Sequence, residues 1–391
     1  MGCGSCVYVI GGKKKLTVPE VAVFVPSTRI PAQSDVQKRL RGLIPKDLVD
    51  RQSSLRNQIV LVAEDTVFVI NLYIWDNLDL IKCDELQEAC VANSWFEVLS
   101  VVDLMAMLTL SEADTLMIPF NHSGSTIRTV SSDSKRDAVD LLLKASDYLE
   151  FCVRDVLVRI PPEIKKNLPK ILQDGVLEAI SYQTLGQGTE IQLGLAVEYQ
   201  KAALSVKRRL ACEQLTYFSQ VYRAYNCLSG CDMNNGCEKK HIWFINWKFL
   251  ESKAAPYYYH GLILDKGNEP SCHVSAVCCF LAAEELLSES KKACLTFCLA
   301  APVTRAPPLW GAMRHLHQKI PEVATRKSQM YGYLLEQEKV LQTLPDLSEF
   351  QLSLRPDDYQ LPEIDPAWDS EKWEAEGQTL KAHPKDSDDE T

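Results

Sequence analysis

Long stretches of helical apolar periodicity dominate the sequence after Ala92 and constrain its fold more than any other feature. They predict helices at about residues 92–108, 133–158, 168–184, 195–228, 240–265, 271–298 and 321–343. Turns rich in proline, glycine, asparagine and serine separate these stretches, as at Pro161-Pro162 and Pro307-Pro308. Because long helices with short links must pack side by side, the sequence predicts a mainly α fold.

Two consecutive helices carry small and aromatic residues at the spacing of a tetratricopeptide-like helical hairpin. The first has Trp247-x2-Leu250, Tyr258 and Gly261, and the second has Ala276-x3-Phe280-x2-Ala283. Small residues let the two backbones approach closely, and the aromatic rings fill the remaining space. We therefore expect Trp247 and Phe280 to be buried between paired helices.

The N-terminal quarter is less regular. Residues 1–17 are expected to form a flexible N-terminus, and the alternating Val21, Val23 and Val25 predict an extended or short-strand segment. Residues 35–65 have a helical pattern, whereas the β-branched and aromatic residues 67–75 predict a buried strand.

Composition and charge limit the classes of protein to which this chain can belong. The chain has 391 residues, 46% of them hydrophobic and 24% charged, which is typical of a globular protein. Its net charge is −10, and residues 346–391 alone contain 14 acidic and 4 basic side chains. The rest of the chain is therefore close to neutral, which does not favour a general nucleic-acid-binding protein. Residues 369–391 are expected to be an acidic disordered tail, preceded by a proline-rich extended segment whose aromatic side chains dock on the helices.

The sequence contains no recognisable catalytic motif. It lacks a Walker loop, a nucleophile elbow and a His-Glu-x-x-His zinc motif, and Gly186-Gln187-Gly188 lacks the third glycine of a dinucleotide fingerprint. The histidines are not spaced to activate an obvious nucleophile. We therefore expect a protein that is not an enzyme and that requires no cofactor.

One cysteine-rich loop offers an alternative function. In Cys227-x3-Cys231-x5-Cys237-x3-His241, the last three ligands have the spacing of a CCCH zinc finger, but the first gap is too short for that class. The favoured interpretation is a polar loop without metal, so no metal site is predicted. A zinc-dependent RNA-binding protein using Cys231, Cys237 and His241 remains the alternative.

The N-terminus has the features of a lipid anchor. Gly2 is a candidate for myristoylation after removal of Met1, and Cys3 is a candidate for palmitoylation. One lipid chain binds membranes only weakly, so the thiols and Lys13, Lys14 and Lys15 would supply the second signal. This predicts a cytoplasmic protein attached peripherally to endosomal or other membranes. An unmodified, flexible N-terminus is the alternative.

A short apolar stripe in one predicted helix has two possible roles. Val206 and Leu210 lie one turn apart, on either side of Lys207-Arg208-Arg209. Core packing beside a solvated basic face is the default interpretation, and a groove for a partner helix is the alternative.

Several segments together resemble the Bro-type (ALIX/BROX-like) domain of ESCRT accessory proteins, and in particular its compact members. They are residues 92–101 (Ala-Asn-Ser-Trp-Phe-Glu-Val-Leu-Ser-Val), 145–150 (Ala-Ser-Asp-Tyr-Leu-Glu), 185–190 (Leu-Gly-Gln-Gly-Thr-Glu) and the proline-aromatic C-terminal segment. The resemblance covers residues 18–368. It implies a curved, boomerang-shaped helical domain with a tetratricopeptide-like core and a small N-terminal β region. The apolar run at 67–75 departs from the family pattern.

The resemblance also implies a function and a site. The function is that of a non-enzymatic adaptor in endosomal sorting, which docks on the C-terminal helix of an ESCRT-III subunit. Alignment with the family helix that carries the apolar docking patch places Leu193, Val206 and Leu210 in that patch. Lys207 and Arg208 would then attract acidic side chains of the partner.

Overall fold

The computed structural model describes residues 8–10, 14–16, 19–26, 46–51, 53–55, 93–119, 130–199, 201–228, 236–300, 311–337 and 344–363. Contacts divide the chain into two units, residues 1–29 with 67–359 and residues 30–66 with 360–391. In the second unit, residues 46–51 and 53–55 are helical, in the region expected to be helical. The strand predicted at 67–75 and the tail at 369–391 lie outside the described residues. All elements below belong to the first unit.

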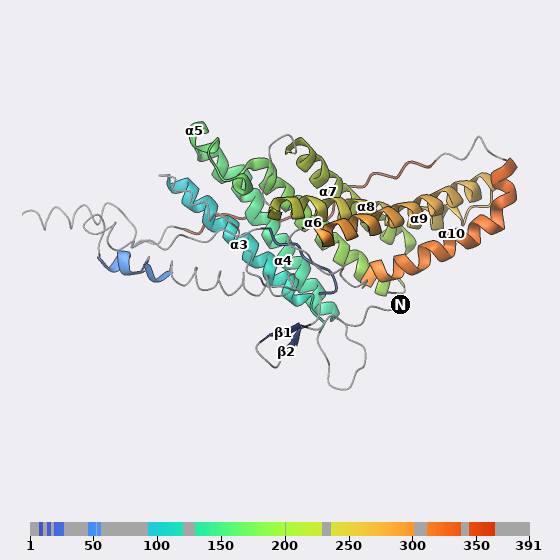
Figure 1. Ribbon diagram of the computed structural model, residues 1–391, viewed down its shortest axis with the longest axis horizontal. Helices are drawn as coiled ribbons and strands as arrows, with labels where there is room; N and C mark the ends of the chain where they lie inside the picture. Colours follow the sequence, from blue (N-terminus) through green and yellow to red (C-terminus); the bar gives the residue numbers. More distant parts are fainter. Residues whose placement is uncertain are drawn as a thin grey trace, which may run out of the picture. The chain divides into compact units, whose positions relative to one another are not determined.

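The first unit is built almost entirely of helices, which confirms the predicted fold class (Figure 1). Only β1 (Tyr8–Ile10) and β2 (Lys14–Leu16) pair as strands among the described residues, in an antiparallel hairpin. This hairpin lies within the N-terminus expected to be flexible. The helices are α3 (Ser94–Leu116), α4 (Ser132–Phe151), α5 (Pro162–Lys165), α6 (Asp174–Glu198), α7 (Leu204–Leu228), α8 (Gly236–Leu264), α9 (Pro270–Leu299) and α10 (Gly311–Gln337), with a π-helical turn at Cys152–Val156 and 3-10 turns at Leu157–Arg159 and Lys170–Leu172.

Several predicted helix boundaries are wrong, and those of α6 and α10 are the most informative. Helix α6 continues through the glycines where a break was expected, because these glycines serve helix packing. A Cβ on Gly186 would lie 2.9 Å from the ring of Phe218, and one on Gly188 would lie 2.9 Å from Leu354. Helix α10 begins ten residues before Pro321, which lies inside the helix rather than at its start.

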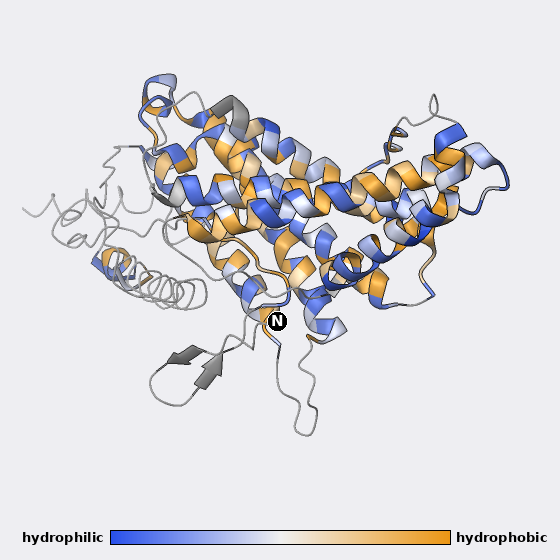
Figure 2. Cartoon of the chain, turned by 45° about the vertical axis from the view of Figure 1, so that its right-hand side comes forward, coloured by the Kyte–Doolittle hydropathy of each residue, from blue (hydrophilic) through white to orange (hydrophobic). Residues whose placement is uncertain are grey.

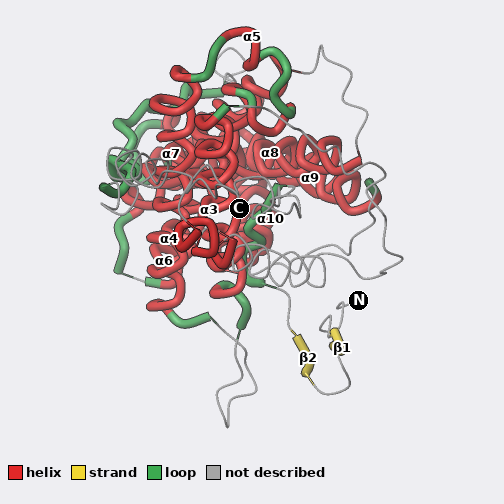
Figure 3. The backbone as a smooth tube through the Cα atoms, turned by 90° about the vertical axis from the view of Figure 1, so that its left-hand side faces the viewer, coloured by secondary structure: helices red, strands yellow, loops and turns green. Residues whose placement is uncertain are grey.

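Helices α8 and α9 form the predicted tetratricopeptide-like pair and lie side by side (Figure 3). Phe280 is fully buried, and its ring packs against the backbone of Gly261. Trp247 is also buried, but its ring lies 5.5 Å from that of Phe297, toward the other end of the pair. The expectation of burial is therefore confirmed for both aromatic residues.

Apolar side chains are buried in three clusters between the helices. Figure 2 colours each helix by hydropathy and shows that hydrophobic and hydrophilic residues both occur along it. One large cluster joins α3, α4 and α6, a second joins α8, α9 and α10, and a third surrounds Phe244 and Phe297. Helices α3 and α9 have the length and composition of a membrane span. Core helices pass the same test, and 56% of the α3 window is buried inside the protein.

The alternating valine segment is extended, but helices rather than strands hold it. Val23, Phe24 and Val25 are buried. Side chains of the helices bond to the backbone here: Asp114 accepts from Val23 N at 2.8 Å, and Gln183 and Gln187 donate to the carbonyls of Phe24 and Ala22 at 2.9 Å each. Since each buried backbone group needs a partner, these side chains replace a neighbouring strand.

Candidate functional site

Helix α7 presents a stripe of side chains that is open at one end and covered at the other. Val206, Leu210, Glu213 and Tyr217 are spaced by four, three and four residues, so they share one face of the helix. Val206 is 48% exposed and Leu210 is half-buried, whereas Glu213 and Tyr217 are each only 1% exposed. The exposed apolar end is the candidate docking surface.

Leu193 does not belong to the exposed part of this surface, so that part of the prediction is wrong. Its side chain is 1% exposed and packs in the cluster that includes Ala211 and Tyr258. Leu210 packs against the same cluster with part of its side chain exposed. Leu193 therefore supports the surface from within the core, and Val206 is the most accessible of the three predicted apolar contacts.

Lys207 lies within electrostatic reach of helix α10. Burial lowers the pKa of His315, and the positive charges of Lys207 and Lys319 lower it further. Positive charge from α7 and α10 therefore acts on His315, and Lys319 is itself paired with Glu322 at 2.9 Å.

Arg208 points elsewhere, which corrects its predicted role. A residue two positions from Val206 lies about 200° around the helix, so the two cannot share a face. Its Nη1 lies 3.1 Å from Nδ1 of His260 in α8, and its guanidinium lies 5.5 Å from the ring centre of Phe350. Arg208 therefore holds neighbouring parts of the protein together.

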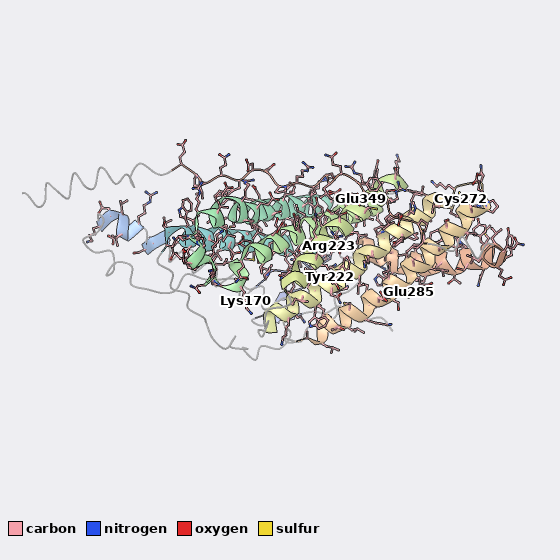
Figure 4. All side chains as sticks on the ribbon, turned by 90° about the horizontal axis from the view of Figure 1, so that it is seen from above. Lys170, Tyr222, Arg223, Cys272, Glu285 and Glu349 are labelled. Carbon is pink, nitrogen blue, oxygen red and sulfur yellow. The ribbon has the colours of Figure 1, made fainter. Side chains whose placement is uncertain are left out.

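The covered end of the stripe lies beneath an extended C-terminal segment, here called the strap (residues 344–359). Glu349 marks the strap in Figure 4, where Tyr222 and Arg223 mark α7. Both carboxylate oxygens of Glu213 accept hydrogen bonds from it: Oε1 from the backbone N of Ser353 at 2.5 Å and of Leu354 at 2.8 Å, and Oε2 from Ser353 Oγ at 2.6 Å. Tyr217 donates to the carbonyl of Leu354 at 2.5 Å. Sequence reasoning missed Glu213, although an acidic residue in a buried helical stripe is itself an unusual signal.

The strap is also fixed at its C-terminal end, as expected for the proline-rich segment. Tyr359 docks edge-on against Tyr148 and Phe151, with ring centres 4.8 and 5.2 Å away. Its backbone N donates to Asp147 at 2.7 Å. The other aromatic residues of this prediction, Trp368 and Trp373, lie outside the described residues.

The alternative zinc site is not favoured by the position of His241. The ring is buried and stacks on Phe24 with centres 4.8 Å apart. Nδ1 lies 2.6 Å from the hydroxyl of Tyr225, and Nε2 is hydrogen-bonded to Gln183. Burial lowers the pKa of His241 to about 3, so the ring is neutral, with one nitrogen donating and the other accepting. Neither nitrogen is left for a metal ion. The other two ligands of this alternative, Cys231 and the side chain of Cys237, lie outside the described part of the chain.

The residues of the predicted membrane anchor cannot be placed either. The structure does not describe Gly2, Cys3 and Lys13, nor the side chains of Lys14 and Lys15 in β2.

The most highly charged buried group is structural. Lys248 of α8 contacts Glu190 of α6 and Glu251 of its own helix, each at 2.8 Å, and all three side chains are at most 5% exposed. Burial lowers the pKa of Lys248, but the two carboxylates outweigh this effect and raise it overall. Burial raises the pKa of Glu190, against the effect of Lys248. A substrate has no access to these groups, so the cluster joins helices and offers no catalytic site.

The helical pairs define this chain as an all-α scaffold of the tetratricopeptide-like kind, and comparison with solved structures specifies the fold. A structure described as the ALIX BRO1 CHMP4C complex matches with a TM-score of 0.58 and 12% identity, over 89% of this chain and 97% of that chain. ALIX in complex with the SIVmac239 PYKEVTEDL late domain matches with a TM-score of 0.52 and 12% identity, over 88% of this chain and 50% of that chain. No protein-family model matches, and no curated protein sequence gives a significant match. The chain has the fold of a Bro1 domain.

Proposed function

We propose that this protein is a non-enzymatic adaptor that docks an amphipathic helix of an ESCRT-III subunit on the open end of the α7 stripe. The observation that carries the proposal is the exposure of Val206. A valine that is 48% exposed beside the half-buried Leu210 leaves apolar surface that a partner helix can cover. The solved ALIX Bro1 complex with CHMP4C supports a partner of this class for a chain with this fold.

The charges around the stripe specify the partner further. Lys207 and Lys319 of α10 supply positive charge near the neutral ring of His315. An acidic amphipathic helix would bind with its apolar residues on Val206 and Leu210 and its carboxylates toward these bases. The apolar anchors would supply most of the affinity and the bases most of the orientation.

Val206→Asp tests the proposal with little risk to folding, because the residue is exposed. Binding of a fluorescent peptide from an ESCRT-III C-terminal helix should fall at least about tenfold, while the melting temperature stays close to wild type. Leu281→Asp is the matched control, since Leu281 is 43% exposed on α9. Leu210→Asp is less informative than Val206→Asp, because Leu210 also packs against a core cluster. Unchanged peptide affinity in Val206→Asp would place the groove elsewhere.

We further propose that Gly2 and Cys3 attach the protein to a cytosolic membrane face, with Lys13 to Lys15 as the electrostatic signal. The support is the sequence pattern alone. Gly2→Ala should move most of the protein from the membrane to the soluble fraction of lysed cells, and Lys13→Ala should move much less. An unchanged distribution in Gly2→Ala would contradict the anchor.

A further inference from the structure

Ser353 occupies an unusual position in the strap. Its hydroxyl lies 2.6 Å from Oε2 of Glu213, a carboxylate that is buried on α7. Ser353 itself is exposed, whereas the next residue, Leu354, is buried. The hydroxyl of an exposed residue on an extended segment thus lies directly against a buried negative charge.

We propose that Ser353 is a phosphorylation site and that its phosphate releases the strap from α7. In the reaction, Ser353 Oγ attacks the γ-phosphorus of a nucleoside triphosphate bound by a protein kinase. The new Oγ–P bond forms as the bond from phosphorus to the β,γ-bridging oxygen breaks, the nucleoside diphosphate leaves, and the hydroxyl proton passes to a base of the kinase. Ser353 is an exposed residue on the extended, non-helical backbone of residues 344–363, so a kinase can reach the acceptor once Oγ turns away from Glu213.

The phosphate and the bound strap are electrostatically incompatible. Phosphoserine carries a charge of about −1.5 to −2 at pH 7 and has lost the donor that Ser353 Oγ gave to Glu213. Two negative groups at hydrogen-bonding distance repel strongly where one of them is buried. Moving Ser353 away breaks its backbone bond to Glu213 and also that of Leu354.

Release would change the surroundings of the α7 stripe. Leu354 would leave its position against Gly188, and Tyr217 would lose the carbonyl to which it donates. Upstream, Phe350 packs on Arg208, and the carbonyl of Gln351 accepts from Arg209 at 3.5 Å. Phosphorylation would therefore uncover the end of the stripe that the strap now covers.

The first experiment installs phosphoserine at position 353 of the full chain by genetic encoding and follows amide hydrogen exchange. The amide of Leu354, a donor to Glu213, should exchange at least about tenfold faster than in the unmodified chain. Phosphoserine at 348 is the control: Ser348 is exposed in the same strap, and no hydrogen bond holds its side chain among the described residues. It should leave the amide of Leu354 protected.

Two further measurements make the inference falsifiable. Ser353→Asp should also speed exchange, and adding Glu213→Gln should restore part of the protection, because the second change removes the repelling charge. The full chain is also incubated with ATP and cytosolic extract, and phosphate on Ser353 is measured by mass spectrometry; Glu213→Gln, which loosens the strap, should increase it. Unchanged exchange in the phosphoserine 353 chain, or no phosphate on Ser353 even in Glu213→Gln, would overturn the proposal. Neither measurement uses a binding partner, so failure here is distinct from failure of the proposed docking function.

Discussion

Gly261 of α8 lies directly against Phe280 of α9. A Cβ at position 261 would lie 2.7 Å from Cε1 of that ring and 3.1 Å from the carbonyl oxygen of Ala276. The missing side chain is therefore what allows the two helices to approach closely enough to bury the ring. Glycine costs helix stability at an interior position, so its presence here is explained by packing.

Gly261→Ala should destabilise the protein by about 1 to 3 kcal/mol, because the added methyl group forces a buried ring or the helix backbone to move. Gly332→Ala on α10 is the matched control. Nothing lies within 4 Å of a Cβ at Gly332, so the substitution should raise helix stability by up to about 1 kcal/mol. Urea unfolding of both variants measures the difference, and an equal effect of the two substitutions would contradict the packing role of Gly261.

Phe280→Ala should cost about 3 to 5 kcal/mol, the sum of lost transfer free energy and a residual cavity. The neighbouring residue provides the control, since Leu281 is 43% exposed and Leu281→Ala should change the free energy of unfolding far less. Thermal unfolding followed by circular dichroism distinguishes them. A melting temperature unaffected by Phe280→Ala would show that the ring does not support the α8–α9 pair.

Asp114 should make stability fall as the pH rises from about 4 to 7. Burial raises its pKa from 3.8 to about 7, against the opposing effect of the hydrogen bond from Val23. The folded protein then holds a proton that the unfolded chain has already lost, so folding becomes less favourable as the pH rises through this range. Asp114→Asn keeps an acceptor for Val23 and does not titrate. The free energy of unfolding of this variant should therefore depend less on pH between about 4 and 7, and above pH 7 it should be larger than that of the wild type.

Urea unfolding between pH 5 and 8 measures that effect. Asp140→Asn, on the exposed face of α4, is the control and should keep the wild-type profile. If Asp114→Asn is as sensitive to pH as the wild type, another group is responsible.

His241 should act in the opposite direction. Burial lowers its pKa to about 3, so between about pH 3 and 6.5 the unfolded chain binds a proton that the folded protein does not. The neutral His241 ring therefore contributes fully to the free energy of unfolding above pH 6.5, and this contribution is lost as the pH falls toward about 3. The ring resonances of His241, followed by NMR, should show no protonation between pH 7.5 and 5. A titration midpoint near 6.5 would be inconsistent with its bonds to Tyr225 and Gln183.

The sequence predicts the parts of this fold that depend on local periodicity. Helices α8 and α9 and the burial of Phe280 follow from spacings within one helical pair. The meaning of a glycine cannot be decided from its neighbours in sequence. Gly186 and Gly188 suggest the end of a helix, and only their contacts with the distant Phe218 and Leu354 explain why the helix continues. Local reasoning thus identifies elements better than their ends.

Dependence on local periodicity also explains why only part of the candidate site could be predicted. Val206 and Leu210 lie on one face because of helical spacing alone, but the burial of Leu193 depends on helices whose positions the sequence does not give. Arg208 was assigned by its proximity in sequence, although helix geometry turns it away from Val206. The bond between Glu213 and Ser353 joins residues 140 positions apart, and no local pattern encodes it.

That separation also sets an order of events during synthesis. Helices α6 and α7 leave the ribosome long before the strap. Until residues 353 and 354 emerge, the Glu213 carboxylate and the Tyr217 hydroxyl of a growing chain stay hydrated. The space above Gly188, which Leu354 occupies in the folded protein, stays unfilled for the same time. The middle of the protein therefore acquires its final packing only when a segment translated 140 residues after Glu213 folds back onto it. A nascent chain arrested before Ser353 presents an incomplete surface at this place, and chaperones that bind exposed apolar groups have that interval in which to act.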